Sequence, residues 1–253
     1  MKDKIIIEGN DNLHAEFQHL GPHHCFIGRV RVKPHEEFIL SDLERRGVTL
    51  FPSGLSQQLS RSKIRQARLL GAYMIPHTIV IFDQHDLLHA VNLYTKHEVG
   101  KVVTKDDRKN GGMGIHLWRS VEDVFNQATL SVLPYPFVLQ PFIPDCRDIR
   151  ALKFADYTEN YERANPTNFR NNLHCGGTSE PITLTAKQEK MCTDIMGRGD
   201  FPYAHIDLMI TPDGTTYLAE INLRGGLRGA TISAPAYKKM LAGIHQQFRS
   251  QLL

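Results

Sequence analysis

The sequence has 253 residues, which is enough for one large domain or two small ones. Hydrophobic residues make up 41% and charged residues 23%, a balance typical of globular proteins that excludes a disordered chain. Lysine and arginine number 30 against 27 aspartates and glutamates. The resulting formal charge of +3 is too small for a nucleic-acid coat or a membrane-surface protein, so we expect neither partner.

The four cysteines are widely and irregularly spaced, and none forms a C-x-x-C pair. We therefore expect free thiols rather than a disulfide framework or a structural zinc site. The first nine residues contain only three consecutive isoleucines, too few for a secretory signal, and no run approaches the ~20 apolar residues of a membrane span. These features predict a cytoplasmic protein.

The N-terminal part alternates short apolar runs with an amphipathic segment. Residues 4–9 read as a strand ended by glycine, residues 38–46 as a helix that stops near Gly47, and residues 48–51 as another strand closed by Pro52. This alternation predicts a small α/β unit over residues 1–57.

The middle of the chain, residues 58–135, mixes helical and strand patterns. Apolar residues at helical spacing predict a helix over 60–70 that Gly71 ends. The elements expected after it are a strand at 78–82, a helix at 86–94, strands at 101–105 and 115–118, and a helix at 121–129.

The last part, residues 136–253, is predicted to hold four strands and two helices. The strands are expected at 137–140, 148–154, 203–210 and 216–222, and the helices at 186–196 and 235–252. Asp148, Arg150 and Lys153 are expected to project from one of these strands. Thr211-Pro212-Asp213-Gly214 predicts a hairpin turn between the last two strands.

A glycine-rich loop follows the strand that ends in Lys105. Gly111, Gly112 and Gly114 occupy three of four positions between two predicted strands. Glycines let backbone amides approach an anion closely, and a lysine beside them adds a charge for phosphate oxygens. The loop matches neither a Walker loop nor a dinucleotide fingerprint, because it returns into a strand rather than a helix. A simple flexible hairpin is the alternative.

Asp207, Glu220 and Asn222 lie on the two strands of the predicted hairpin. The two-residue spacing puts Glu220 and Asn222 on one sheet face, and the hairpin brings Asp207 beside them. Carboxylate and amide oxygens suit Mg²⁺ shared with substrate phosphates. Solvated side chains on an edge strand are the alternative.

Five arginines in the last part could recognise a carboxylate or a phosphate through paired hydrogen bonds, or could simply be solvated. They are Arg150, Arg163, Arg170, Arg224 and Arg228.

Taken together, these stretches resemble the ATP-grasp ligases, specifically their RimK-like and glutathione-synthetase-like branch, over roughly residues 58–253. Five stretches in the family's order carry the resemblance. They are Ser60-Arg61-Ser62-Lys63 with residues 66–78, 102–105 with 112–114, 138–143, 148–150 with 169–177, and Asp207 with Glu220-Ile221-Asn222.

The resemblance implies an ATP-grasp fold of the α+β class, in which two α+β subdomains grip ATP after a short N-terminal α/β unit. It implies that a substrate carboxylate takes the γ-phosphoryl group and that an amine then attacks the acylphosphate, which forms an amide or peptide bond. The cofactors implied are ATP and Mg²⁺ or Mn²⁺. The partners implied are a small carboxylate and an amine, with a peptide or protein tail and a homo-oligomer left open.

The resemblance also assigns roles to residues of this sequence. Arg170 and Asn172 would act in catalysis, and the metal ligands would be Asp207, Glu220 and Asn222. The substrate would meet Arg150, Arg163, Arg224 and Arg228. The nucleotide would meet Lys63, Lys105, Gly111, Gly112, Gly114, Gln140, Phe142, Ile143 and Asp148.

Two departures from the family pattern affect recognition. Pro141 stands in the hinge strand where many relatives have an acidic residue, and Arg224 and Arg228 follow Asn222 where relatives often carry Ser-Pro-Gly. The added arginines could bind an acceptor carboxylate. Two other functions stay open, an ATP-binding regulatory module without turnover and an ATP-grasp kinase that stops at a phosphorylated product.

Overall fold

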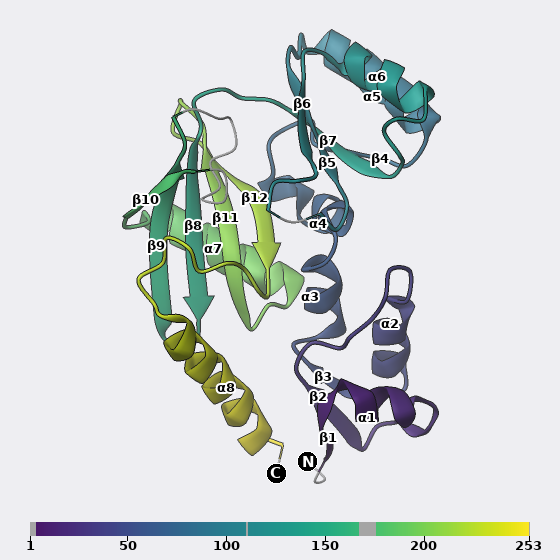
Figure 1. Ribbon diagram of the computed structural model, residues 1–253, viewed down its shortest axis with the longest axis vertical. Helices are drawn as coiled ribbons and strands as arrows, with labels where there is room; N and C mark the ends of the chain where they lie inside the picture. Colours follow the sequence, from purple (N-terminus) through teal and green to yellow (C-terminus); the bar gives the residue numbers. More distant parts are fainter. Residues whose placement is uncertain (1–3, 110, 167–175, 253) are drawn as a thin grey trace.

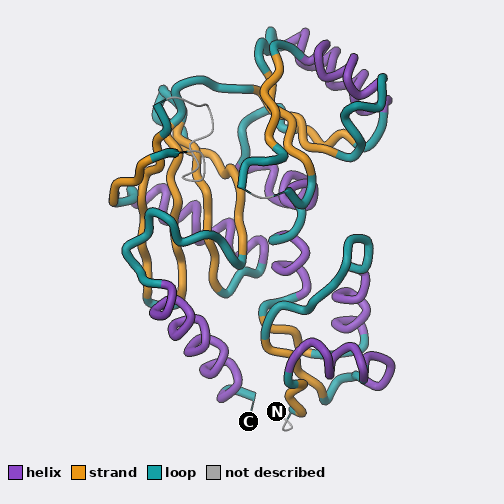
Figure 2. The backbone as a smooth tube through the Cα atoms, viewed as in Figure 1, coloured by secondary structure: helices purple, strands orange, loops and turns teal. Residues whose placement is uncertain are grey.

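The computed structural model describes residues 4–109, 111–166 and 176–252, and this part of the chain forms three β-sheets (Figure 1). Each sheet has helices packed against it, and the helical segment of residues 54–73 lies among them (Figure 2). None of the helices in the described ranges has the length and apolar character that a membrane crossing requires. Cys25, Cys146 and Cys192 are free thiols, as expected, and Cys175 lies outside the described residues.

The first sheet is parallel and has the order β1-β2-β3. Its strands are β1 (Ile5–Ile7), β2 (His24–Ile27) and β3 (Thr49–Phe51), with helices α1 (Gly9–Ala15) and α2 (Phe38–Arg45) and the 3-10 turn η1 (Phe17–His19). Leu13, Leu40 and Leu43 are fully buried in the core of this unit. Burial of their apolar surface holds the two helices onto a sheet of only three short strands.

Two helices connect this unit to the rest, where the sequence predicts one. They are α3 (Gly54–Leu59) and α4 (Lys63–Leu70), followed by the 3-10 turn η2 (Gly71–Tyr73). The break falls at Ser62, whose side chain accepts a hydrogen bond from the Arg65 amide and so caps the start of α4. The helix predicted over residues 60–70 therefore begins three residues later, at Lys63, and ends at Leu70 as expected. The preceding helix α3 was not predicted.

The second sheet is antiparallel, with the order β4-β7-β5-β6. Its strands are β4 (Ile79–Ile81), β5 (Val102–Asp106), β6 (Ile115–Trp118) and β7 (Phe137–Pro141), and its helices are α5 (Gln84–Lys96) and α6 (Val121–Thr129). The two helices pack against each other and against the sheet (Figure 1). Val102, Phe137 and Leu139 are buried beneath them.

The third sheet is antiparallel, with the order β10-β9-β8-β11-β12. Its strands are β8 (Arg147–Phe154), β9 (Tyr157–Ala164), β10 (Thr178–Pro181), β11 (Tyr203–Ile210) and β12 (Thr216–Asn222), and its helices are α7 (Ala186–Gly199) and α8 (Ala234–Ser250). The predicted hairpin turn joins β11 to β12.

The two faces of the third sheet have different surroundings. Asp148 and Arg150 lie on one face, whereas Lys153 lies on the other and donates to Glu189 of α7 at 2.6 Å. All three side chains project from β8 as expected, and they divide between its two faces because side chains alternate along a strand. Helix α8 covers only part of the first face, where its Tyr237 meets His205 of β11.

Candidate nucleotide and metal site

A crevice lies where the second sheet, helix α4 and strand β12 come together. Lys63, Gln66 and Lys105 line it with Met74, Thr78, Val138 and Ala219. Lys63 is the first residue of α4, and Gln66 is a buried residue of the same helix. Lys105 comes from β5. The structure therefore brings together two of the predicted nucleotide lysines, which are 42 positions apart in the sequence.

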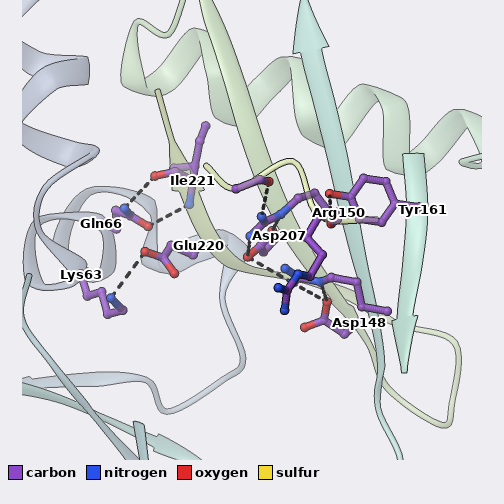
Figure 3. Close-up of polar contacts among 11 residues, drawn as sticks. Lys63, Gln66, Asp148, Arg150, Tyr161, Asp207, Glu220 and Ile221 are labelled. Carbon is purple, nitrogen blue, oxygen red and sulfur yellow. Dashed lines mark hydrogen bonds and ion pairs between the residues drawn. The ribbon is translucent and has the colours of Figure 1, made fainter. Parts of the chain in front are cut away.

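Lys63 points from the first turn of α4 toward the end of β12 (Figure 3). Its Nζ lies 3.4 Å from Glu220 Oε1 and also donates to the carbonyl of Lys109 in the glycine-rich loop. A single ammonium group thus contacts both a predicted metal ligand and the loop predicted to cover phosphates.

Lys105 is a half-buried residue that also lines the crevice. Burial lowers its pKa to about 8, with Glu220 opposing the shift and the charge of Lys63 adding to it. At neutral pH the group is still charged, and it forms no ion pair with a carboxylate of the described residues. A desolvated lysine of this kind interacts strongly with phosphate oxygens.

Gln66 fixes the position of β12 relative to α4. Its Oε1 accepts from the Ile221 amide at 3.0 Å, and its Nε2 donates to the Ile221 and Leu59 carbonyls, each at 2.8 Å (Figure 3). The side chain is only 1% exposed. Because Ile221 follows Glu220 directly, these bonds also position the carboxylate of Glu220.

The glycine-rich loop is anchored at its first residues. Asp107 accepts hydrogen bonds from Ser62 Oγ at 3.1 Å and from the Ile64 amide at 3.3 Å, both at the start of α4. Arg108 forms an ion pair with Glu37, a buried residue at the start of α2. The loop therefore joins the second sheet, α4 and the N-terminal unit.

The predicted metal ligands lie on neighbouring strands. Asp207 of β11 is paired directly with Glu220 of β12, and His205 is paired with Asn222, with a β-bulge after Asp207. Arg150 makes a two-bond ion pair with Asp207, in which Nε lies 2.7 Å from Oδ1 and Nη2 lies 2.8 Å from Oδ2 (Figure 3). The hairpin thus brings the predicted oxygen donors together.

Arg163 completes a four-residue charge network with Arg150, Asp148 and Asp207. Its Nε lies 2.6 Å from Asp148 Oδ1 and its Nη2 lies 3.2 Å from Asp207 Oδ2. Burial opposes ionisation of Asp207, but Arg150 and Arg163 outweigh it and hold the pKa of that carboxyl well below its usual range. Burial raises the pKa of Asp148, with Arg163 opposing. Two arginines predicted to bind substrate, Arg150 and Arg163, therefore contact Asp207, which is predicted to bind metal. Arg163 also contacts Asp148, which is predicted to bind the nucleotide.

The donor chemistry of this face suits a hard divalent cation. Two carboxylates and an amide oxygen on adjacent strands match the oxygen ligands that Mg²⁺ and Mn²⁺ prefer. Across the described ranges, no group of three or more His, Cys, Asp and Glu side chains meets as metal ligands. An amide oxygen from Asn222 and oxygens of a bound phosphate would therefore have to complete the shell.

The remaining predicted nucleotide residues follow β7. Gln140 is buried and donates to Thr78 Oγ1 at 3.0 Å, the Phe142 amide donates to the Lys101 carbonyl, and the Ile143 carbonyl accepts from Cys146 Sγ. These bonds fix the connection between the second and third sheets. The bond from Gln140 sets its side chain beside Thr78, which lines the crevice.

The predicted substrate and catalytic residues are only partly placed. Arg224 and Arg228 are exposed on the loop after β12, and Arg150 also donates to the carbonyl of Gly226 in that loop. Arg170 and Asn172 lie outside the described residues.

Sequence patterns missed four residues that organise the site, namely Gln66, Glu37, Asp107 and Arg108. One signal was present for Gln66. It is a polar residue three positions after Lys63, on a helix whose neighbouring buried positions are Ile64 and Leu70. Glu37 carries no such signal, because its partner Arg108 lies 71 positions away.

Solved structures with the same arrangement of elements define the class of fold. The D-cycloserine synthetase DcsG aligns with a TM-score of 0.61 and 15% identity, over 90% of this chain and 84% of that one. The ATP-grasp ligase PsnB, complexed with a phosphomimetic variant of its minimal precursor, Mg and ADP, aligns with a TM-score of 0.57 and 16% identity, over 87% and 77%. The predicted ATP-grasp fold of the α+β class is confirmed.

The family follows from the sequence itself. Residues 60–244 match the model of the RimK-like ATP-grasp domain, so the chain belongs to that family. A glutathione synthetase from Agrobacterium fabrum is 27% identical over 60% of this chain, which spans about half of that protein (48%). A probable α-L-glutamate ligase from Serratia proteamaculans is 22% identical over 97% of this chain and 92% of its own length. These names support the predicted class of ATP-dependent carboxylate–amine ligase.

Proposed function

We propose that this protein is an ATP-dependent carboxylate–amine ligase that works through an acylphosphate. The observation that carries the proposal is the crevice lined by Lys63 and Lys105, where Lys63 contacts Glu220, the strand partner of Asp207. It sets phosphate-binding cations beside oxygen ligands for a divalent cation. A substrate carboxylate oxygen attacks the γ-phosphorus of ATP, and ADP leaves. An amine nitrogen then attacks the acyl carbon, phosphate leaves, and the nitrogen loses a proton.

The residues around the crevice bind the nucleotide. Lys63 and Lys105 hold phosphate oxygens, and the loop with Gly111, Gly112 and Gly114 covers them and excludes water, which protects an acylphosphate from hydrolysis. The connection that contains Gln140, Phe142 and Ile143 lies beside the adenine. Asp148 lies on the face of the third sheet that carries Asp207, where it accepts a hydrogen bond from Arg163.

Asp207, Glu220 and Asn222 would hold Mg²⁺ or Mn²⁺, which when bound neutralises charge on the transferring phosphates. Arg150 and Arg163 hold Asp207 ionised and oriented, so their main contribution is to position a ligand. Arg170 and Asn172 are proposed to stabilise the transferring phosphoryl group, on the strength of the family resemblance.

The carboxylate and the amine are proposed to be an amino acid, a peptide or another small acid. The glutathione and glutamate named for the relatives, and the precursor bound to PsnB, support both small and peptide acceptors. The unit boundaries at residues 57 and 135, a cytoplasmic location and a homo-oligomer stay predictions.

Phosphate release from MgATP, measured over a panel of amino acids, dipeptides and small carboxylic acids offered singly and in pairs, tests the proposal. Release that requires one acid and one amine, with ADP as co-product, would establish a ligase. Release with a single acid and a stable phosphorylated product would instead establish a kinase. ATP binding without release for any pair, together with no ATP-dependent coupling, would contradict the ligase and favour a regulatory module.

The variant Lys105→Met should abolish release, since it removes a half-buried cation of the crevice while keeping the length of the side chain. Lys101→Met, an exposed residue at the start of the same segment, is the matched control and should release phosphate at the wild-type rate.

A further inference from the structure

Two carboxylates and two cations form one row across the third sheet and α4. Asp207 and Glu220 are direct partners on β11 and β12, and Arg150 is the partner of Asp207 on β8. Lys63 of α4 completes the row beyond Glu220 (Figure 3). The order along the row is therefore cation, acid, acid, cation. Because directly opposed residues on antiparallel strands have Cβ atoms about 5 Å apart, the two acids repel each other unless positive charge lies beside them.

The cations at the two ends of the row are held with different firmness. Arg150 makes two bonds to Asp207, at 2.7 and 2.8 Å, and a third to the Gly226 carbonyl at 3.2 Å. Lys63 Nζ makes one contact with Glu220, at 3.4 Å, which is longer than a charge-assisted hydrogen bond. Its ammonium group is carried on a flexible four-carbon stem. Lys63 is therefore the cation that can leave the row.

The contact between Lys63 and Glu220 is shielded from water. The Lys63 side chain is only 11% exposed and the Glu220 side chain 23%, so salt and water screen the two charges little. A carboxylate in such a place is costly without a positive charge beside it. Lys63 therefore supplies to Glu220 the same service that a bound metal ion would supply, which is neutralisation of its charge.

Lys63 and a metal ion at Glu220 would lie close enough to repel each other strongly. A metal ion bound to Glu220 Oε1 at about 2.1 Å would lie no more than about 5.5 Å from Lys63 Nζ. Asp207 raises no such conflict with Arg150, because each carboxylate oxygen has two lone pairs and the guanidinium uses one on each oxygen. Competition with a metal ion is thus confined to the Glu220 end of the row.

The balance of charge points the same way. The crevice and the adjoining charge network contain more cationic side chains than carboxylates. The cations are Lys63, Lys105, Arg150 and Arg163, and the carboxylates are Asp148, Asp207 and Glu220. A free divalent cation would add to this excess of positive charge, whereas ATP complexed with the cation keeps a net negative charge and would offset it.

We infer that Lys63 and a divalent cation compete for Glu220, so that the site takes up the cation together with ATP and not alone. The inference rests on the proposed function, in which the ammonium group of Lys63 binds phosphate oxygens. Phosphates that draw Lys63 away from Glu220 free this carboxylate for the cation that the same nucleotide carries. By linkage, the nucleotide and the cation raise each other's affinity by the same factor.

Binding of Mn²⁺ in the absence of nucleotide tests the inference. Free Mn²⁺ gives an electron paramagnetic resonance signal that is lost on binding, so the measurement needs no turnover. The wild-type protein should bind Mn²⁺ with a dissociation constant of about 1 mM or weaker, as the weakest protein sites for divalent cations do. Lys63→Met removes the ammonium group and keeps the length of the side chain, so it should bind Mn²⁺ at least about 10-fold more tightly.

Controls assign the gained binding to Glu220 and guard against a variant that folds poorly. Lys101→Met makes the same substitution at an exposed lysine and should bind Mn²⁺ as the wild type does. Adding Glu220→Gln to Lys63→Met should remove the gain. The wild type alone provides a second measurement, the midpoint of thermal unfolding with Mg²⁺, with the β,γ-methylene analogue of ATP, and with both. Mg²⁺ alone should not raise the midpoint, and both together should raise it more than the analogue alone.

Three results would overturn the inference. They are a wild-type protein that binds Mn²⁺ with the same affinity as Lys63→Met, a rise of the unfolding midpoint with Mg²⁺ alone, and a gain in Lys63→Met that survives Glu220→Gln. The proposed function fails by a different result. Absence of phosphate release for every acid and amine, while Lys63→Met binds Mn²⁺ more tightly than the wild type through Glu220, would refute the ligase and leave the competition at Glu220 standing.

Discussion

Replacing Gln66 with methionine should destabilise the protein without changing its surface. Methionine has nearly the same length and fills the same space, but it cannot make the three hydrogen bonds that join α4 to Ile221 and to Leu59. The amide and carbonyl of Ile221 and the carbonyl of Leu59 would be left in an interior where Gln66 is 1% exposed.

The size of the effect follows from those bonds. A buried neutral hydrogen bond contributes about 1 kcal/mol, so three of them give a loss of about 3 kcal/mol in the free energy of unfolding. With a urea dependence of about 3 kcal/mol per molar, the midpoint of urea unfolding should fall by about 1 M. Gln66→Glu should be at least as destabilising, because it places a carboxylate against two carbonyl oxygens.

Urea unfolding followed by circular dichroism measures the change. Gln58→Met is the matched control, because Gln58 lies one helix earlier, is partly exposed and makes one side-chain bond, to Ser41 Oγ at 3.2 Å. Its midpoint should shift by less than about 0.3 M. A Gln66→Met protein as stable as the control would refute the argument that this amide joins α4 to β12.

Three further predictions concern the charges of the site. Glu220→Gln should lower turnover about 100-fold at limiting Mg²⁺ while circular dichroism stays unchanged, and normal turnover there would remove Glu220 from the metal site. Since burial lowers the pKa of Lys105 to about 8, its charge is present below that pH and lost above it. The dissociation constant for ATP should therefore rise from about pH 8 upward, and a flat profile would contradict this, while Lys105→Arg should stay flat to about pH 9. Glu37→Gln removes one of the two acidic partners of Arg108 and leaves Asp107, so hydrogen exchange over residues 106–115 should become faster, and unchanged exchange would show that the pair with Glu37 does not hold the loop.

The order of elements could be predicted wherever apolar periodicity was strong. The strands at Phe137–Pro141, Tyr203–Ile210 and Thr216–Asn222 were expected within one residue at each end, because their cores are apolar and turn residues bound them. Strand β9 was missed because Tyr157–Ala164 carries polar residues at most positions. Tertiary pairing with β8 makes it a strand, and no local signal reports that pairing.

The candidate site was predictable in its residue types and not in its partners. The neighbouring positions of Asp207 and Glu220 were predictable, because a hairpin pairs its two antiparallel strands residue by residue. Nothing local indicated that Arg150 and Arg163 would be bound to Asp207 and Asp148, since those bonds depend on the register of three strands.

The anchored loop between β5 and β6 implies that its glycines would behave differently in a mutational scan. Gly111 has a φ of +67° and open space around a Cβ, so an L-alanine there would be strained by handedness alone, and a D-alanine would keep the turn. At Gly114 a Cβ would lie 2.5 Å from the Lys109 side chain, so a methyl of the L form is excluded by crowding within the loop itself. Loss of activity in Gly114→Ala would thus show that crowding distorts the loop itself. Loss of activity with D-alanine at residue 111, which keeps the backbone turn, would show that a ligand approaches that position closely.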